Sequence, residues 1–131
     1  KVYVLNEGSD VTILACGYMV WEALQAAERL EEQGIRAEVV NVATIKPLEE
    51  DAIVGSLQKT GCAVVAEEHN MAGGLGEAVS GVLARRLPSP VEFVNGGDRF
   101  GQSGTPSQLM AAYGLNADAI VEKGNKVISR K

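Results

Sequence analysis

Short apolar runs alternate along this chain with longer segments in which apolar residues recur every three or four positions. The runs at residues 11–16 and 62–66 are almost entirely apolar, which is typical of strands that are buried on both faces of a sheet. Between them, the apolar residues of 20–30 repeat with the period of an α-helix. Strands that alternate with helices in this way predict an α/β fold with a mostly parallel sheet.

The same patterns predict the extent of each element. We expect strands at residues 2–5, 10–16, 35–42, 62–67 and 91–95, and helices at 20–33, 48–57, 75–86, 106–113 and from about 116 to the basic C-terminal end. Gly34 is placed to end the first helix in the left-handed conformation, and Gly61 separates the second helix from the next strand. Residues 105–108 have the spacing of a capping box, and Gly114 is expected to end the helix that follows. The predicted architecture is a three-layer α/β/α sandwich around a mixed, mostly parallel, five-stranded sheet.

Length and charge narrow the classes of partner. The 131 residues fit one domain, residues 1–131. The formal net charge of −5 argues against a nucleic-acid or anionic-membrane partner, because both require a positive protein surface. No apolar run approaches the roughly 20 residues that span a bilayer, and no secretory signal pattern is present. We therefore expect a cytoplasmic protein.

The two cysteines, Cys16 and Cys62, lie in apolar stretches. They cannot form a tetrahedral zinc site without further ligands, since such a site needs four. Their spacing does not exclude a disulfide, but a domain of this size can build a core without one. We expect two reduced and buried thiols.

His69 is the only histidine, and it follows Glu68 where a predicted strand gives way to a loop. At the carboxyl edge of a parallel sheet, such a residue could serve as a general base or as a metal ligand. The alternative is a histidine that hydrogen-bonds for structure or contacts another subunit. We favour this alternative because no Ser, Cys or Asp is visibly paired with it.

Gly73, Gly74 and Gly76 lie between a predicted strand and a predicted helix. Glycines at a helix N-terminus expose N–H groups that can hold a phosphate. However, this sequence matches neither the dinucleotide-binding nor the Walker motif, and the two carboxylates of Glu67 and Glu68 lie just upstream. We favour the alternative that these glycines allow close approach between a helix and its neighbours.

The most polar loop covers residues 97–104, where Asp98 and Arg99 could bind a substrate or pair with each other. Tyr18 and Trp21, at the start of the first helix, are expected in the core or in an interface. No catalytic triad, metal-ligand cluster or pair of catalytic carboxylates stands out in this sequence. The residues considered alone do not form an active site.

Several pieces of the sequence, taken in order, resemble the C-terminal domain of the transketolase family. They are residues 10–17 with Ala23 and Leu30, then 45–48, 65–69, 73–76, 98–104 and 113–115. Similar domains also close deoxyxylulose-phosphate synthases and the beta subunits of 2-oxo acid dehydrogenase E1 components. Residues 68–70 and 98–101 look most like the transketolase branch, and especially its split type, in which the C-terminal half is a separate chain. Deoxyxylulose-phosphate synthases usually carry Asn where this chain has His69.

The resemblance implies an enzyme that uses thiamine diphosphate and a divalent metal, usually magnesium, to move two-carbon ketol units between sugar phosphates. In that family an N-terminal domain with a Gly-Asp-Gly motif holds the diphosphate, and a middle domain with an essential Glu holds the pyrimidine. No Gly-Asp-Gly occurs in this sequence, so no catalytic, cofactor or metal residue carries over, and no cofactor is expected on this chain. The resemblance leaves the role of a non-catalytic scaffold that packs on the middle domain and extends a homodimer contact. Such a chain is not expected to be active alone.

Two alternatives remain open. One is the C-terminal domain of a deoxyxylulose-phosphate synthase. The other is a free-standing ligand-binding or regulatory module, in which His69, Glu68 and the loops with Gly73, Gly74, Gly76, Asp98 and Arg99 line a crevice.

Overall fold

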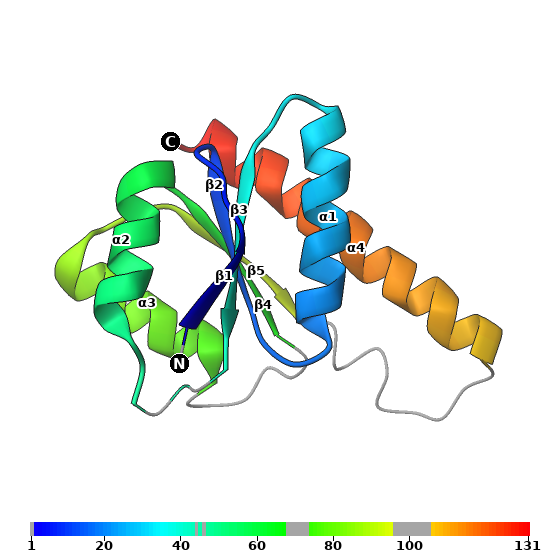
Figure 1. Cartoon of the computed structure of the whole chain (residues 1–131), viewed down its shortest axis with the longest axis horizontal. Helices are drawn as coiled ribbons and strands as arrows, with labels where there is room; N and C mark the ends of the chain where they lie inside the picture. Colours follow the sequence, from blue (N-terminus) through cyan, green and yellow to red (C-terminus); the bar gives the residue numbers. More distant parts are fainter. Residues whose placement is uncertain (1, 44, 46, 68–73, 96–105) are drawn as a thin grey trace.

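The computed structural model describes residues 2–43, 45, 47–67, 74–95 and 106–131, and for residues 106–115 it describes the backbone alone. These residues form a sheet with the strand order β1-β3-β2-β4-β5 (Figure 1). The strands are β1 (Val2–Asn6), β2 (Val11–Ala15), β3 (Ala37–Val42), β4 (Ala63–Glu67) and β5 (Val91–Asn95). β2, β3, β4 and β5 are parallel, whereas β1 pairs with β3 in the antiparallel sense at one edge.

Helices cover both faces of this sheet. α1 (Met19–Glu32) and α4 (Pro106–Ser129) lie on one face, and α2 (Glu50–Thr60) and α3 (Leu75–Arg86) lie on the other (Figure 1). This arrangement confirms the predicted three-layer α/β/α sandwich with a mixed, mostly parallel, five-stranded sheet.

The central strand β2 is buried along its whole length, which explains its nearly continuous apolar sequence. Successive side chains of a strand point to opposite faces. Ile13 accordingly packs in one core with Leu30 of α1 and Ile120 of α4, whereas Leu14 packs in the other core with Ile53 of α2. Each core lies between the sheet and one helical layer.

Two glycines end helices as predicted. Gly34 has φ +80° after α1, and Gly61 has φ +81° after α2, a region that L-residues with a Cβ rarely enter. The N–H of Gly61 donates to the carbonyl of Leu57 at 2.8 Å, which satisfies one free carbonyl at the end of the helix. α2 begins at Glu50 and ends at Thr60, slightly later than the predicted 48–57.

The prediction of two C-terminal helices separated at Gly114 is wrong. α4 is one helix of 24 residues, from Pro106 to Ser129. A glycine inside a helix costs about 1 kcal/mol relative to alanine, but it does not force an end. The buried side chains of Ile120 and Val127 anchor α4 in the core on the α1 side, and such packing readily outweighs that cost. Pro106 occupies the first helical position as predicted, while the capping residue Thr105 lies outside the described residues.

A buried polar cluster joins the first residues of β2 and β3 to α2. Glu38 is 1% exposed, and its carboxylate accepts hydrogen bonds from Lys59 Nζ at 2.6 Å, Ser56 Oγ at 2.7 Å and Gly8 N at 3.2 Å. The Ser56 and Thr12 hydroxyls lie 2.8 Å apart. The cluster satisfies a carboxylate that would otherwise be costly to bury.

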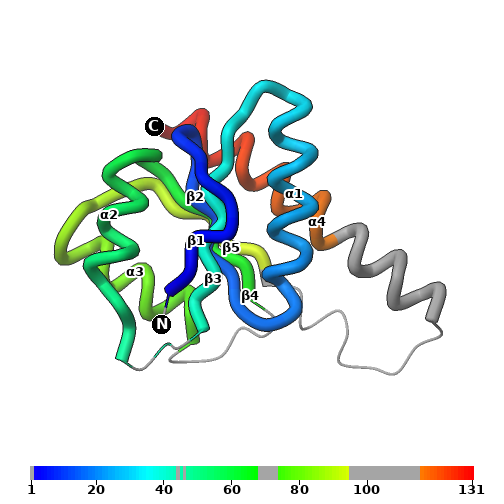
Figure 2. The backbone as a smooth tube through the Cα atoms, in the orientation of Figure 1, coloured from blue at the N-terminus to red at the C-terminus, as the bar shows by residue number. Residues whose placement is uncertain are grey.

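The C-terminal end of the chain is held at the amino edge of the parallel strands. Lys131 Nζ donates to the carbonyl oxygens of Asp10 at 2.9 Å and Thr60 at 2.8 Å. Figure 2 shows this end of the chain beside the start of β2, while β1 begins near the carboxyl ends of the parallel strands. No helix in the described part of the chain has the length and apolar character needed to cross a membrane.

Both cysteines are free thiols, as predicted. Cys62 is buried, and this burial raises the pKa of its thiol. Cys16 is only half-buried, so the expectation that both thiols are fully buried is wrong for Cys16. It follows the last residue of β2, where the chain leaves the sheet.

Candidate functional site

In the sequence, the candidate residues follow β4 and β5, whose last residues lie at the carboxyl edge of the parallel strands. Glu67 and Asn95, the last residues of β4 and β5, are register partners, so the segments that follow these two strands leave from neighbouring points. Gly74 and Gly76 are described at this edge. The remaining candidates lie outside the described residues: Glu68, His69, Gly73, Asp98 and Arg99.

Gly74 is the residue that precedes the first turn of α3. Its backbone is extended (φ −78°, ψ −172°), and its carbonyl accepts the N–H of Ala78 at 3.0 Å. These are the properties of an N-cap. Gly74 has no side chain with which to satisfy the free N–H groups of the helix.

Glu67 satisfies two of those groups instead. Its Oε1 accepts the N–H of Leu75 at 3.2 Å, and its Oε2 accepts the N–H of Gly76 at 2.7 Å. A carboxylate is favoured at this position because the N-terminus of a helix carries partial positive charge. The N–H groups that could have held a phosphate therefore already hold a negative group of the same chain.

Gly76 is closely surrounded by side chains of the sheet. A Cβ at this position would lie 2.7 Å from Glu67 Oε2 and 3.2 Å from the ring of Phe93 on β5. The glycine thus lets α3 approach the sheet while its N–H reaches the carboxylate. This supports the sequence interpretation that this glycine allows close approach, and two of the N–H groups that a phosphate at α3 would use are occupied by Glu67.

The described residues do not fit a thiamine diphosphate site. A diphosphate at α3 would meet the carboxylate of Glu67, and the N–H groups that it needs donate to that carboxylate. Among the residues that the structure describes, no group of three or more His, Cys, Asp or Glu side chains could hold a metal ion.

Several large apolar side chains are exposed. Tyr18 is 67% exposed and Trp21 is 63% exposed, both at the start of α1. Of the two predicted locations, the core is therefore excluded and an interface remains. Phe93 on the edge strand β5 is 48% exposed. The opposite edge strand also exposes apolar side chains, those of Tyr3, Val4 and Leu5.

The sequence analysis did not identify Glu22 as a buried charge. This α1 residue is 1% exposed, and its Oε1 has no hydrogen-bond partner among the described residues. Glu22 lies three residues after Met19 and four before Ala26, both of which are buried. Helical spacing therefore placed it on the inner face of α1, and that was the signal that could have revealed it.

Comparisons with known proteins agree with the fold. A family model described as the transketolase C-terminal domain matches residues 1–120. The 6-deoxy-6-sulfo-D-fructose transketolase subunit of Clostridium sp. (strain MSTE9) is 47% identical over 131 residues, which are 100% of this chain and 41% of that protein. The 1-deoxy-D-xylulose-5-phosphate synthase 1 of Geobacter sulfurreducens is 39% identical over 137 residues, covering 98% of this chain and 20% of that protein.

A solved structure is also similar. It is described as an inactive β4 tetramer of a split gene transketolase, and it superposes with a TM-score of 0.87 at 46% identity. The match covers 98% of this chain and 42% of that one. This chain thus spans less than half the length of each of these relatives. With the family match over residues 1–120, these similarities show that the chain belongs to the family of transketolase C-terminal domains.

Proposed function

We propose that this chain is the non-catalytic C-terminal scaffold of a thiamine diphosphate-dependent transketolase, which transfers two-carbon ketol units between sugar phosphates. The observation that carries the proposal is the extent of the match. Almost the whole chain corresponds to about two fifths of a transketolase subunit at 47% identity, and to a similar share of a split transketolase at 46%. The rest of the relatives' length leaves room for the domains that bind the cofactor.

The chemistry of the carboxyl edge supports a role without catalysis. At the N-terminus of α3, Glu67 already accepts the N–H groups of Leu75 and Gly76, which a diphosphate would need. In this proposal, thiamine diphosphate and magnesium bind to the N-terminal and middle transketolase domains, on the same chain or on a separate one. The contribution of this domain is then to hold those domains in their active arrangement.

The exposed aromatic residues at the carboxyl edge are the proposed contact with the middle domain. Tyr18 lies at the start of α1, and Phe93 is the middle residue of the edge strand β5. Aromatic side chains with this degree of exposure are favourable anchors for an interface, because they bury a large apolar area.

A homodimer in the cytoplasm completes the proposal, since closed symmetric dimers are the commonest assembly. The split transketolase solved as a β4 tetramer is itself described as inactive.

Reconstitution tests the proposal. The chain is mixed with the N-terminal and middle domains of the same enzyme, and ketol transfer between sugar phosphates is measured for each component and for the mixture. We expect activity in the mixture and none with this chain alone. Absence of activity in a mixture of correctly folded, associated components, with thiamine diphosphate and magnesium present, would overturn the proposal.

A matched pair of variants tests the contact surface. Tyr18→Ala removes an aromatic side chain from the carboxyl edge, and it should weaken association with the other domains by about 2 kcal/mol, or roughly thirtyfold. Glu32→Ala, at the other end of α1, is the control and should leave the affinity unchanged. Equal affinities for the two variants, measured by calorimetry on chains with unchanged unfolding curves, would exclude Tyr18 from the contact.

Light scattering over a concentration series tests the homodimer. A constant monomer mass would contradict it.

The second candidate is a 1-deoxy-D-xylulose-5-phosphate synthase, because one such enzyme is 39% identical to this chain. The transketolase subunit is favoured because its identity is higher and the chain covers twice the share of its length. In the same reconstitution, formation of 1-deoxy-D-xylulose 5-phosphate without ketol transfer would favour the synthase.

A further inference from the structure

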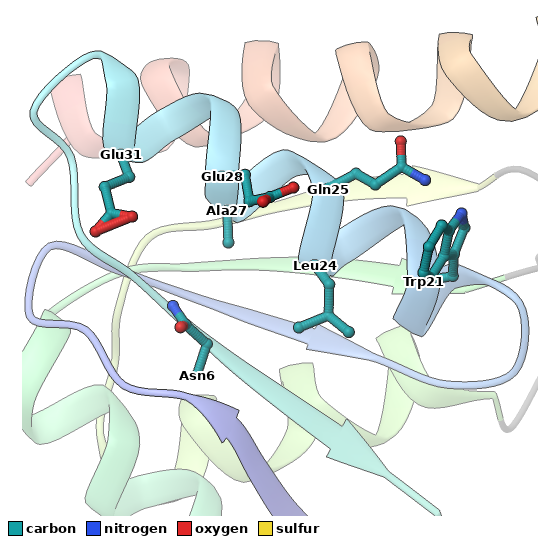
Figure 3. A pocket seen from close by; sticks show the side chains of 7 residues that line it. All are labelled: Asn6, Trp21, Leu24, Gln25, Ala27, Glu28 and Glu31. Atoms are coloured by element: carbon teal, nitrogen blue, oxygen red, sulfur yellow. The ribbon is translucent and has the colours of Figure 1, made fainter.

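A groove lies between the exposed side of α1 and the end of the edge strand β1 (Figure 3). It exists because β1 pairs only with β3, and α1 packs on the inner strands of the sheet. Asn6 of β1 pairs with Val39, which belongs to the core on the α1 side, so Asn6 faces the same side of the sheet as α1. The volume is about 280 Å³, and the lining residues are Asn6, Trp21, Leu24, Gln25, Ala27, Glu28 and Glu31. We call this the α1–β1 groove.

The lining of the groove combines an aromatic ring, an apolar floor and two carboxylates. Trp21, Leu24, Glu28 and Glu31 follow one another at intervals of three or four residues, so they form one stripe along α1. Trp21 lies at one end of the groove and Glu31 at the other, with Leu24 directed toward the sheet (Figure 3). An apolar group and a positive charge, side by side, are what such a stripe would bind.

The charges around the groove are mostly negative. Within the described part of the chain, neither Glu28 nor Glu31 takes part in an ion pair with a basic side chain. A second hollow of about 180 Å³ shares Asn6, Ala27 and Glu31 with the groove, and it adds Glu7 and Arg36. The three carboxylates outnumber the single guanidinium, so the combined surface attracts cations.

We propose that the α1–β1 groove docks a basic segment of another protein chain. One Arg or Lys side chain of the segment lies on the face of Trp21, a second pairs with the carboxylates of Glu28 and Glu31, and an apolar residue between them packs on Leu24. A cation over an indole ring is attracted by the quadrupole of the ring, and a guanidinium hydrogen-bonds strongly to carboxylates. Charge complementarity therefore identifies the class of partner.

A second copy of this chain is a poor occupant. Most basic side chains in the described residues are already paired with carboxylates of the same chain, and these are Arg29, Lys59, Arg85, Arg86, Lys123, Lys126 and Arg130. Of the other two described basic residues, Arg36 lines the hollow that adjoins the groove, and Lys131 Nζ already donates to two backbone carbonyls. The occupant is accordingly a different chain, and the proposal does not depend on the assignment to a transketolase.

The test uses Trp21, which is the only tryptophan of the chain, as a reporter. The ¹⁵N-labelled chain is titrated with the peptide acetyl-Leu-Arg-Leu-Arg-amide while the indole N–H resonance is followed by NMR. The matched probe is the same peptide with citrulline in place of arginine, which keeps the shape and removes the charge. We expect a saturable shift with the arginine peptide, about tenfold weaker binding of the citrulline peptide, and weaker binding of the arginine peptide at high salt.

Variants test whether the carboxylates of Glu28 and Glu31 bind the arginine peptide. Glu28→Gln with Glu31→Gln should weaken binding of the arginine peptide by about tenfold, whereas Glu32→Gln, one residue outside the stripe, should leave it unchanged. These exposed positions tolerate glutamine, and unchanged unfolding curves verify the fold. Equal binding of the two peptides, or an equal loss in Glu32→Gln, would overturn the proposal. Loss of peptide binding when this chain is assembled with the N-terminal and middle domains would also overturn it, because the groove would then be an internal contact of the enzyme.

Discussion

Two buried glutamates of this domain have pKa values that are shifted in opposite directions. Burial tends to raise the pKa of Glu38, but hydrogen bonds from Lys59, Ser56 and Gly8 outweigh it, so the net shift is downward. Burial also raises the pKa of Glu22, and there the N–H of Ala117 and the charge of Arg29 offset it only in part. The difference comes from the partners, because both side chains are almost completely buried.

Glu38→Gln should destabilise the domain at pH 7 by about 2 kcal/mol, because it weakens charge-assisted hydrogen bonds in a buried place. A carboxyl whose pKa is lowered by folding stabilises the protein above its unfolded pKa, and this contribution is lost as the pH falls through the folded pKa. The difference between wild type and variant should therefore shrink toward acid pH. Urea unfolding at a series of pH values measures this difference in the free energy of unfolding. A constant difference from pH 7 to pH 3 would contradict the stabilising role of the ionised Glu38.

Glu22→Gln should have the opposite pH dependence. The wild-type carboxyl binds its proton more tightly when folded, so the wild type loses stability as the pH rises from the unfolded pKa through the folded pKa. Glutamine keeps a carbonyl oxygen for Ala117 and carries no charge, so the variant should gain about 1 kcal/mol relative to wild type at pH 8. The gain should vanish at low pH. Lower stability of the variant at pH 8, in the same unfolding assay, would contradict this prediction, because the partners of the carboxylate would then outweigh the cost of its burial.

At the scale of elements, α3 contains two glycines with different surroundings. Gly76 lies against Glu67 and Phe93, whereas Gly81 has no atom within 4 Å of a Cβ built on it. Gly76→Ala should destabilise the domain by about 1–3 kcal/mol, because the new methyl group displaces the carboxylate that caps α3. Gly81→Ala should stabilise it by about 0.5–1 kcal/mol, because alanine favours a helix. In urea unfolding, Gly76→Ala should have the lower midpoint and Gly81→Ala the higher one. Equal midpoints would contradict the close approach at Gly76.

The sequence predicted most elements because each is marked by a local pattern. The apolar run of β2 and the helical period of α1 are properties of neighbouring residues, and the glycines at 34 and 61 end helices through their own backbone conformation. Gly114 misled the prediction because a glycine only permits a helix to end, and the packing of α4 on the core decides whether it does. The capping of α3 by Glu67 was not predicted either, because the carboxylate comes from the preceding strand and meets Leu75 and Gly76 only in the fold.

At the scale of the whole molecule, the two edges of the parallel strands have different roles. The amino edge is closed by the Glu38 cluster and by Lys131, which binds the carbonyls of Asp10 and Thr60. β1 begins at the carboxyl edge, where Val2 pairs with Val42. The exposed Tyr18 belongs to this edge too, so the contacts that we propose with the rest of a transketolase concentrate there.

The most direct test of the proposed role is a calorimetric titration of this chain with thiamine diphosphate in the presence of magnesium. We predict no saturable heat, because Glu67 already holds the N–H groups of α3 and the proposed cofactor site lies on other domains. The complex reconstituted with those domains is the positive control and should bind the cofactor stoichiometrically. Stoichiometric binding to this chain alone would contradict the scaffold role and would place a cofactor site on this domain.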